Sequence, residues 1–532
     1  MNNLTLQNFR TYKERTSIDL APITILTGKN NAGKSTIFKS LLLLSDYLNS
    51  DNQFILEFDG PNAHKHKIDC FDNALTWASD KKSFSFKYKT NNHTFSFTFG
   101  KDDNKGVLTD FTVISVDGFY LKMKKLSTDV YNVEMDYGFI ESCLITDIHE
   151  DAVLASDMII DQLQQELTQA NHFIEKLKKS DSVTEEQIHW TSKRNVISQR
   201  INKEKRFSRS IQNKKKKDLI PGESVIKFEI DLSDKKIVTS RKLISLLSNH
   251  LDKHYELPEY YKTNEKNDIN QLKSHLHDFK YTLNMSMKLG SYHLGPNRTH
   301  QSRLYMNRNR DNEINEIMNF YAHNKPPVGS KKDLFLKRWL RAFDIGDEIT
   351  VKDVQSTASY ITIVDDGEEQ NLTDKGFGAG QVLTMLMKII NVSKNPEDAT
   401  PFKFWLELIQ TIIIEEPETN LHPEFQSKLA EMFYDAHKTF DIRFIIETHS
   451  EYLIRKFQVL TADPEEKVET GEILLYYIYT NKDISNISTL NKVEPISILK
   501  DGRLSKPLGS GFFDESSKHA KILVKLSRNK II

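Results

Sequence analysis

The feature that most constrains this fold is a glycine-containing loop near the N-terminus, between an apolar run at 23–26 and a long apolar-periodic segment. The loop fits the pattern G-x-x-x-x-G-K-[ST] through Gly28, Gly33, Lys34 and Ser35. Glycine lets the backbone come close enough for its N–H groups to point at phosphate oxygens. Lysine neutralises the β- and γ-phosphates, and serine offers an oxygen to Mg²⁺. The pattern predicts a strand–loop–helix unit that binds ATP and Mg²⁺ through Gly28, Asn30, Asn31, Gly33, Lys34, Ser35 and Thr36.

A second chemical motif, "TIIIEEPETNLHP", occupies residues 411–423. Three consecutive isoleucines indicate a strand buried on both faces, and the strand runs directly into Glu415 and Glu416. Carboxylates in that position are unfavourable unless a cation, a water to be activated or a second protein surface lies beside them. We expect Glu415 to orient the Mg²⁺ shell through water, and Glu416 to polarise the attacking water as the catalytic base. The alternative is a solvated acidic loop.

A third motif follows in "DIRFIIETHSEYLIRKF", where an apolar strand at 444–446 ends close to His449. A histidine at the tip of the neighbouring strand can sense the γ-phosphate or hold the attacking water. We therefore assign His449 to catalysis, together with Glu416 and Lys34. The alternative is a strand-end histidine that caps the following helix.

Two weaker patterns could also contact an anion. In "LTDKGFGAGQVLTMLMKII", Gly378, Gly380 and Gln381 stand where an amphipathic helix begins, so this loop could offer backbone N–H groups to a phosphate. The alternative is a flexible turn. Near a Gly-Pro turn, Arg298 and Arg303 fit either an anion contact or a salt-bridged surface.

Taken in order, these segments resemble the heads of SMC, RecF and OLD proteins, which are ABC-type ATPases. The opening "LTLQNFRTYKERTSIDL" resembles the start of such heads, in which the turn at Arg10 lies near the nucleotide. "DKGFGAGQVL" corresponds to the signature loop, although it departs from LSGGQ, and "ETHS" carries the switch histidine. The acidic strand follows the glycine loop by about 380 residues, a distance that SMC-like heads fill with helical insertions. The resemblance implies an α/β ABC-type P-loop ATPase head with an inserted helical hairpin.

The same resemblance implies how the chain works. Two heads would associate head-to-tail around two ATP molecules, and each site would join the loop 376–381 of one chain to Glu415, Glu416 and His449 of the other. The tail "VEPISILKDGRLSKPLGSGFFDES" resembles a bacterial OLD-like group that includes the PtuA family, the ATPases of Septu-type and retron-associated anti-phage systems. That group implies a separate HNH nuclease, PtuB-like, as partner, and a reverse transcriptase with its RNA/DNA product as a further one.

Two other functions remain open. We expect ATP hydrolysis, which can be slow. The sequence contains no Toprim or HNH constellation, so we expect no nuclease site in this chain. The first alternative is an SMC/RecF-like DNA repair or recombination ATPase that acts directly on DNA. The second is a scaffold that holds ATP and turns it over very slowly.

The insertion between the two halves is predicted to be a short coiled coil. Apolar residues recur at spacings of three and four, at Ile160, Leu163, Leu167, Ala170, Ile174 and Leu177, and a second helical stretch carries Trp190, Ile197 and Ile201. From Lys193 to Lys217 the chain has eleven Lys/Arg against one acid, Glu204. This arm (193–217) is a solvated surface, a nucleic-acid contact or a docking site for an acidic protein.

Composition sets the remaining limits. The 532 residues carry a net charge of −1, so no global signal for nucleic acid or membrane exists. Two cysteines exclude a disulfide framework, and no signal peptide or apolar run of about 20 residues is present, which favours a cytoplasmic protein. We divide the chain into the N-terminal half of the head (1–150), the basic hairpin (151–217), a mostly helical accessory segment (218–290) and the C-terminal half of the head (291–532).

Overall fold

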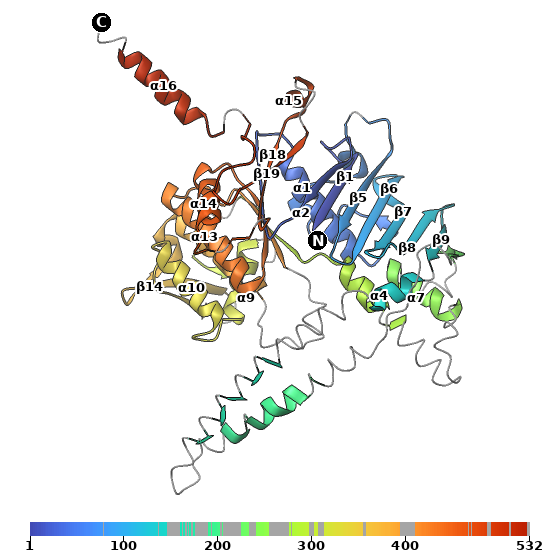
Figure 1. Ribbon diagram of the computed structural model, residues 1–532, viewed down its shortest axis with the longest axis horizontal. Coiled ribbons are helices and arrows are strands. Elements are labelled where there is room, and N and C mark those ends of the chain that lie inside the picture. The colour runs from blue at the N-terminus through green and yellow to red at the C-terminus, as the bar shows by residue number, and fades with distance from the viewer. Residues whose placement is uncertain are drawn as a thin grey trace.

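The computed structural model has an α/β architecture built around three β-sheets (Figure 1). Its description covers residues 1–145 without 78 and 137, then 225–233, 241–254, 276–296 without 278, 303–306, 313–354, 358–393, 410–466, 468–469, 471–486, 491–509 and 512–528. Between 160 and 205 it covers single residues and short runs of helix.

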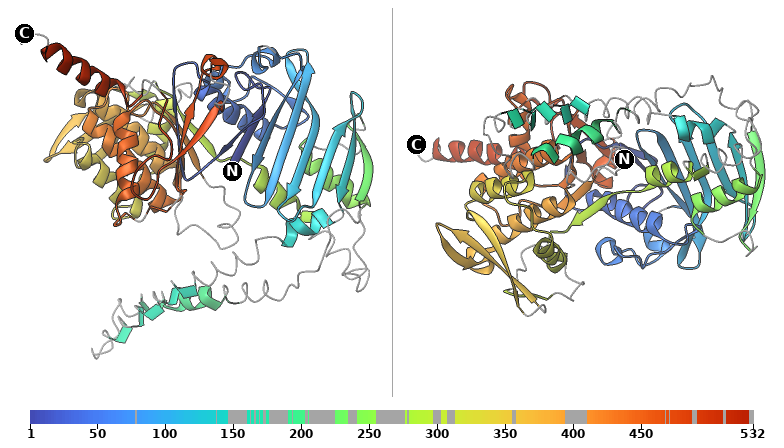
Figure 2. Two further views of the ribbon diagram at one scale, coloured as in Figure 1. Left: turned by 45° about the horizontal axis from the view of Figure 1, so that its top comes forward. Right: turned by 90° about the horizontal axis from the view of Figure 1, so that it is seen from below.

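The first sheet is antiparallel and forms one side of the molecule (Figure 2). Its strand order is β10-β9-β8-β7-β6-β5-β1-β2, with β4 paired to β7. Aromatic and polar residues alternate along β5 and β6, so one face is buried and the other is not. The strands are β1 (Asn3–Gln7), β2 (Thr16–Asp19), β4 (Ile55–Leu56), β5 (Ser83–Lys89), β6 (His93–Asp102), β7 (Lys105–Ser115), β8 (Tyr120–Lys125), β9 (Val130–Asp136) and β10 (Val225–Asp231).

The second sheet carries the glycine loop and both acidic strand ends. Its order is β11-β16-β17-β3-β18-β19, and every neighbouring pair is parallel except β18–β19. The isoleucines of β16 alternate between two cores: Ile413 packs on one side of the sheet, while Ile412 and Ile414 pack on the other. The strands are β3 (Ile23–Gly28), β11 (Ser291–Leu294), β16 (Thr411–Glu415), β17 (Arg443–Glu447), β18 (Ile473–Ile478) and β19 (Val493–Ser497).

Helices cover both faces of this second sheet, which makes it the central layer. α1 (Lys34–Asn49) packs between it and the antiparallel sheet. The opposite face packs against α9 (Glu313–His323), α10 (Lys331–Ala342), α11 (Phe377–Val392), α13 (Pro423–Phe440) and α14 (Glu451–Ala462). The phenol of Tyr476 exchanges hydrogen bonds of 3.0 Å with the backbone of Asp19, so β18 is also tied to the antiparallel sheet.

Smaller elements complete the description. A four-stranded sheet comprises β12 (Tyr305–Met306), β13 (Glu348–Val354), β14 (Ala358–Asp365) and β15 (Glu368–Asn371), and the 3₁₀ helix η2 (Leu372–Lys375) follows it. The remaining helices are α2 (Ala63–His66), α3 (Phe71–Ala74), α4 (Gly138–Ile145), α7 (Leu243–His254), α15 (Asn481–Asn486) and α16 (Glu515–Arg528). In the described part of the chain, no helix is long and apolar enough to cross a bilayer.

The described residues of the insertion are helical and lie away from the two main layers (Figure 1). Leu163 of the first arm packs with Ile197 and Ile201 of the second, and Leu167 lies against them. The two arms therefore meet through the apolar positions that the spacing predicts. Leu177 and most of the basic arm, including 206–217, lie outside the described residues.

Candidate nucleotide site

The glycine loop joins β3 to α1 at the carboxyl edge of the parallel sheet. Gly33 adopts φ 111° immediately before the helix, a left-handed conformation that glycine tolerates best. A Cβ on Gly28 would lie 2.3 Å from the carbonyl oxygen of Ile478 on β18, so only glycine fits there. The Lys34 ammonium donates to the carbonyl oxygens of Gly28 (2.9 Å) and Lys29 (3.0 Å), which curls its side chain back over the loop. The predicted strand, loop and helix are all present.

Glu447, the last residue of β17, is a site residue to which the sequence analysis assigned no role. The residue is 6% exposed, and its carboxylate lies 3.6 Å from the Lys34 ammonium and accepts from the Ser35 hydroxyl at 3.4 Å. Burial raises the pKa of Glu447 to about 7, and the charges of Glu415 and Glu416 oppose its ionisation further. Burial also lowers the pKa of Lys34. The two loop side chains that would meet phosphate and Mg²⁺ are therefore held by this carboxylate.

Glu415 and Glu447 lie side by side because β16 and β17 are parallel neighbours in register. The nearest partner of Glu415 is His293 on β11, whose Nε2 lies 2.6 Å from the Glu415 carboxylate. His293 is 6% exposed, and its Nδ1 has no hydrogen-bond partner among the described residues. Strand pairing across β11, β16 and β17 thus brings a buried histidine to the predicted magnesium carboxylate.

Glu416 follows the strand end in a strained backbone conformation. Its φ is 45°, which is uncommon for a residue with a side chain, and its backbone N–H donates to the carbonyl oxygen of Glu447 at 2.8 Å. The hydroxyl of Thr419 donates to the backbone oxygen of Glu416 at 3.0 Å. The turn is therefore tied to both β17 and its own loop, and Glu416 leaves the sheet at a fixed angle.

Glu418 links the acidic turn to His449. One carboxylate oxygen of Glu418 accepts from the backbone N–H of His449 at 2.7 Å, and burial raises the pKa of this carboxyl. The pKa of His449 is lowered, first by partial burial and then by the charge of Lys34. The residue that caps α14 is Ser450, whose hydroxyl accepts from the Leu453 N–H at 3.1 Å. Since a serine performs the capping, the side chain of His449 is not needed for it.

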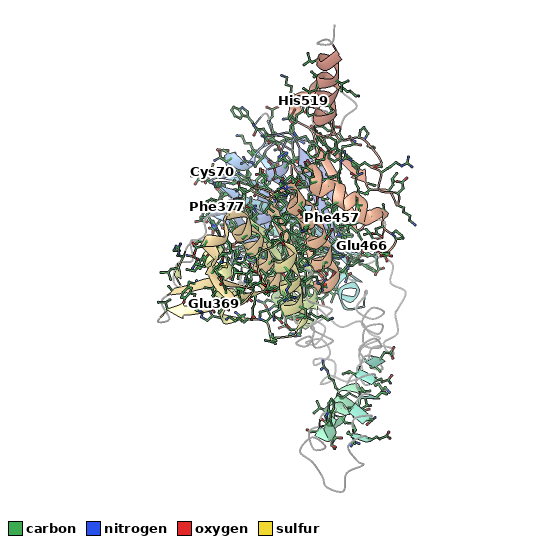
Figure 3. The ribbon with its side chains drawn as sticks, turned by 90° about the vertical axis from the view of Figure 1, so that its left-hand side faces the viewer. Cys70, Glu369, Phe377, Phe457, Glu466 and His519 are labelled. Carbon is green, nitrogen blue, oxygen red and sulfur yellow. The ribbon has the colours of Figure 1, made fainter. Side chains whose placement is uncertain are left out.

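The loop at 376–381 is divided between surface and interior. Gly376 precedes α11 with φ 89°, and Phe377 beside it is 71% exposed and lies towards the edge of the main body (Figure 3). Gly378 packs near Leu421 and Asn420 of the same chain. Gly380 and Gln381 are buried inside the helix, and the Gln381 amide donates to the Pro417 carbonyl at 3.2 Å. The first turn of α11 is therefore joined to the acidic turn within one chain.

Other residues from the sequence analysis have simpler surroundings. Asn30 and Asn31 are exposed on the loop, and Thr36 is buried within α1. Arg10 adopts φ 50° and donates to the Asn73 carbonyl at 3.1 Å, so the predicted turn is present. Arg303 forms a 2.6 Å ion pair with Asp374 beside the 376–381 loop. Of the two alternatives for Arg303, an anion contact or a salt-bridged surface, the structure shows the salt bridge. Arg298 lies outside the described residues.

The residues present fit ATP and Mg²⁺. Because Gly28 and Gly33 have no side chains, the backbone of the loop can come close to a bound phosphate. The Lys34 ammonium can reach that phosphate once it breaks its contacts with the Gly28 and Lys29 carbonyls and with Glu447. Ser35 and Glu415 supply the oxygen ligands that Mg²⁺ prefers. Among the described residues no three His, Cys, Asp or Glu side chains form a ready-made metal cluster.

The fold and the site define a P-loop ATPase with an ABC-type head: a parallel sheet, its glycine loop, and acidic residues on neighbouring strand ends. The chain belongs to the AAA ATPase domain family AAA_15, which matches residues 1–454. That match includes β3, β16 and β17, and so every catalytic residue assigned above.

Similar solved structures are SMC heads. The Smc head domain of Pyrococcus furiosus, with an extended coiled coil and bound to the C-terminal domain of ScpA, is 12% identical over 99% of each chain, with a TM-score of 0.33. The SMC head domain of Thermotoga maritima is 8% identical over 94% of this chain and 98% of that chain, with a TM-score of 0.32. No curated protein matches the chain.

Proposed function

We propose that this chain is the ATP-hydrolysing regulatory subunit of a bacterial anti-phage complex and that it controls a separate HNH nuclease. The observation that carries the ATPase part is the meeting of Lys34 and Ser35 with the acidic ends of β16 and β17. The nuclease part rests on the tail, which resembles the PtuA family, and on the absence of a nuclease motif in the sequence.

Each site residue has a separate task in this proposal. Lys34 neutralises the β- and γ-phosphates, and Glu416 accepts a proton from the attacking water while His449 holds that water or the γ-phosphate. Ser35 and Glu415 would hold Mg²⁺, which neutralises charge on the phosphates when bound. Lys34 and Ser35 must leave Glu447 before they meet the nucleotide, so nucleotide entry would break both contacts.

Hydrolysis would be coupled to association of two heads. Phe377 is exposed, and a Cβ added to Gly376 would meet no heavy atom within 4 Å, so the start of α11 is open to a partner. In the proposed head-to-tail dimer this surface would face the nucleotide of the partner chain. Gln381 would act indirectly in this arrangement, because it already joins α11 to the acidic turn.

The experiment that tests the role is co-purification of the tagged chain expressed with its native neighbouring genes, followed by mass spectrometry. Recovery of a small HNH nuclease, with or without a reverse transcriptase, supports the defence function. Recovery of recombination factors, or of the chain alone, contradicts it. The ATPase assignment is measured separately, by phosphate release from the purified chain.

A second function, DNA repair or recombination on DNA itself, is favoured by the basic arm. Eleven Lys/Arg against one acid in 193–217 suit a phosphate backbone. This function requires DNA to stimulate ATP hydrolysis strongly, and neutralising the four lysines at 214–217 should abolish that stimulation. Equal hydrolysis rates with and without DNA would exclude it.

A further inference from the structure

A cavity of about 460 Å³ lies at the far end of α1, away from the glycine loop. Its walls come from the C-terminal turn of α1, the start of α7 and the helical residues 279–287. The volume is within the range of about 300–1,000 Å³ typical of small-molecule sites. No residue that lines it has been used by the ATPase site described above.

Among the described residues that line the cavity, the charged ones are lysines. They are Lys242, Lys280 and Lys288, and His277 lies beside them. Lys242 forms a 3.1 Å ion pair with Asp51, which is fully exposed outside the lining. Within the described part of the chain, Lys280 and Lys288 have no acidic partner within ion-pair distance. Three lysines around a hollow in a chain of net charge −1 form a local cationic site.

These lysines are not needed to cap the end of α1. The side chain of Asn49 donates to the Ser45 carbonyl at 2.9 Å, the N–H of Ser50 donates to Tyr47, and the Gln53 amide donates to the Leu48 carbonyl at 2.8 Å. The carbonyls of Tyr47 and Leu48, two of the last four in α1, are therefore already satisfied without a lysine. The ammonium groups of Lys280 and Lys288 therefore remain available to an anion from outside the chain.

The rest of the lining suits a base and a sugar. Tyr281 offers an aromatic ring, Met285 and Met287 offer apolar surface, and Asn284 and Ser245 offer polar groups able to make hydrogen bonds. Stacking of a base on an aromatic side chain combined with lysine contacts to phosphate is the usual pattern of nucleotide recognition. We propose that this cavity binds a phosphate-bearing ligand of nucleotide size, as a free nucleotide or as the terminal nucleotide of a strand.

The position of the cavity connects it to the ATPase site. α1 begins with Lys34 and Ser35 and ends at the cavity. The helical residues 279–287 lead through three residues, 288–290, into β11, whose His293 contacts Glu415. A ligand here would therefore contact α1, which begins at the nucleotide site, and the helical segment that leads into β11.

The test uses the full chain with its glycine loop saturated by Mg²⁺ and a non-hydrolysable ATP analogue. Binding of a fluorescent pentathymidylate with a 5′-phosphate is followed by anisotropy, with dTMP as competitor. In the variant Lys280→Gln/Lys288→Gln we expect the affinity to fall by about tenfold or more, because hydrogen bonds to charged groups are lost. The matched control Lys122→Gln/Lys124→Gln removes two exposed lysines from β8 and should change the affinity less than about twofold.

The outcomes separate the ligand sources. If dTMP competes as well as the unlabelled oligonucleotide, the cavity takes free nucleotide; if only the phosphorylated oligonucleotide competes, it takes a strand end. The variant Lys280→Arg/Lys288→Arg, which keeps the charges, should retain binding within a few-fold. Equal losses in the two glutamine variants, or no binding of either probe at millimolar concentration, would overturn the proposal.

Discussion

Glu447 is a buried carboxylate whose role depends on what else occupies the site. Without nucleotide it is the nearest anion to Lys34 and Ser35, and its burial opposes its charge. A phosphate group would compete with it for both side chains. If Lys34 and Ser35 turn to a phosphate, Glu447 loses the two partners that favour its charged form, so nucleotide binding should favour the protonated carboxyl.

The first prediction concerns the pH dependence of stability without nucleotide. The pKa of Glu447 is raised from 4.5 to about 7 in the folded chain, so the folded state binds the proton more tightly than the unfolded state. The protonated Glu447 carboxyl therefore stabilises the folded state below about pH 4.5, and this contribution is lost as the pH rises to about 7. We expect Glu447→Gln to be more stable than the natural chain above pH 7 by up to about 3 kcal/mol, and not at pH 4.5.

Urea denaturation in EDTA across this pH range measures the effect. Glu465→Gln, which removes an exposed carboxylate from the turn after α14, corrects for the loss of one charge. If the stability difference between Glu447→Gln and the natural chain does not change with pH, the raised pKa of Glu447 is contradicted.

The second prediction concerns the catalytic base. Glu416→Gln should keep ATP binding within a few-fold, because the phosphates are held by the glycine loop, while hydrolysis falls by about 10²–10⁴-fold. Single-turnover phosphate release and equilibrium nucleotide binding provide the two readouts. The control is Glu424→Gln, at an exposed carboxylate in the first turn of α13, and this variant should hydrolyse ATP at the normal rate. Near-normal turnover in Glu416→Gln would remove the base assignment.

At the scale of elements, what the sequence could predict depended on distance along the chain. The glycine loop and the acidic end of β16 are contiguous patterns, so local spacing was enough to place Gly28 and Glu415 at strand ends and Lys34 at the start of a helix. Glu447 and His293 reach the site through strand pairing between β11, β16 and β17. The pair β11–β16 joins segments more than 100 residues apart, and no local pattern encodes either pairing.

The signature-like loop illustrates the same limit. Its glycines were evident in the sequence and a helix was expected to follow them, but α11 already begins at Phe377, so Gly378 and Gly380 lie in its first turn and not in a loop before it. The packing of α11 against the acidic turn decides which residues of this segment face solvent. It buries Gly380 and Gln381 and leaves Phe377 exposed. The basic charge of 193–217 was a matter of composition, and its structural role stays a prediction.

The third prediction tests the join between β3 and β18. Gly28→Ala should lower the free energy of unfolding by about 3 kcal/mol or more, because the new Cβ would lie 2.3 Å from the Ile478 carbonyl at φ 142°. Gly295→Ala is the control, since its Cβ would come no closer than 3.5 Å to His293. Denaturant unfolding of both variants measures the difference, and similar losses would show that β3 and β18 can separate at little cost.

At the scale of the whole molecule, the fourth prediction concerns dimerisation. With Mg²⁺ and ATP, Glu416→Gln should accumulate as the head-to-tail dimer, because hydrolysis no longer releases it. Adding Phe377→Glu should abolish the ATP-dependent increase in mass, since a carboxylate would then face the partner's phosphates. Light scattering after size exclusion measures the mass. Phe320→Glu, at an exposed phenylalanine of α9, is the control and should leave the dimer intact.

The place of β3 in the central sheet also determines when the site can exist during synthesis. Both neighbours of β3 come from late in the chain, β17 at 443–447 and β18 at 473–478. At about 5–20 residues per second, a ribosome needs about 20–90 seconds to deliver them after β3 has emerged. For that interval the apolar strand of the glycine loop has no sheet to join, although the antiparallel sheet beside it can already form. The nascent chain is therefore a natural client for chaperones, and any protein cut short before β17 can contain the glycine loop without an ATP site.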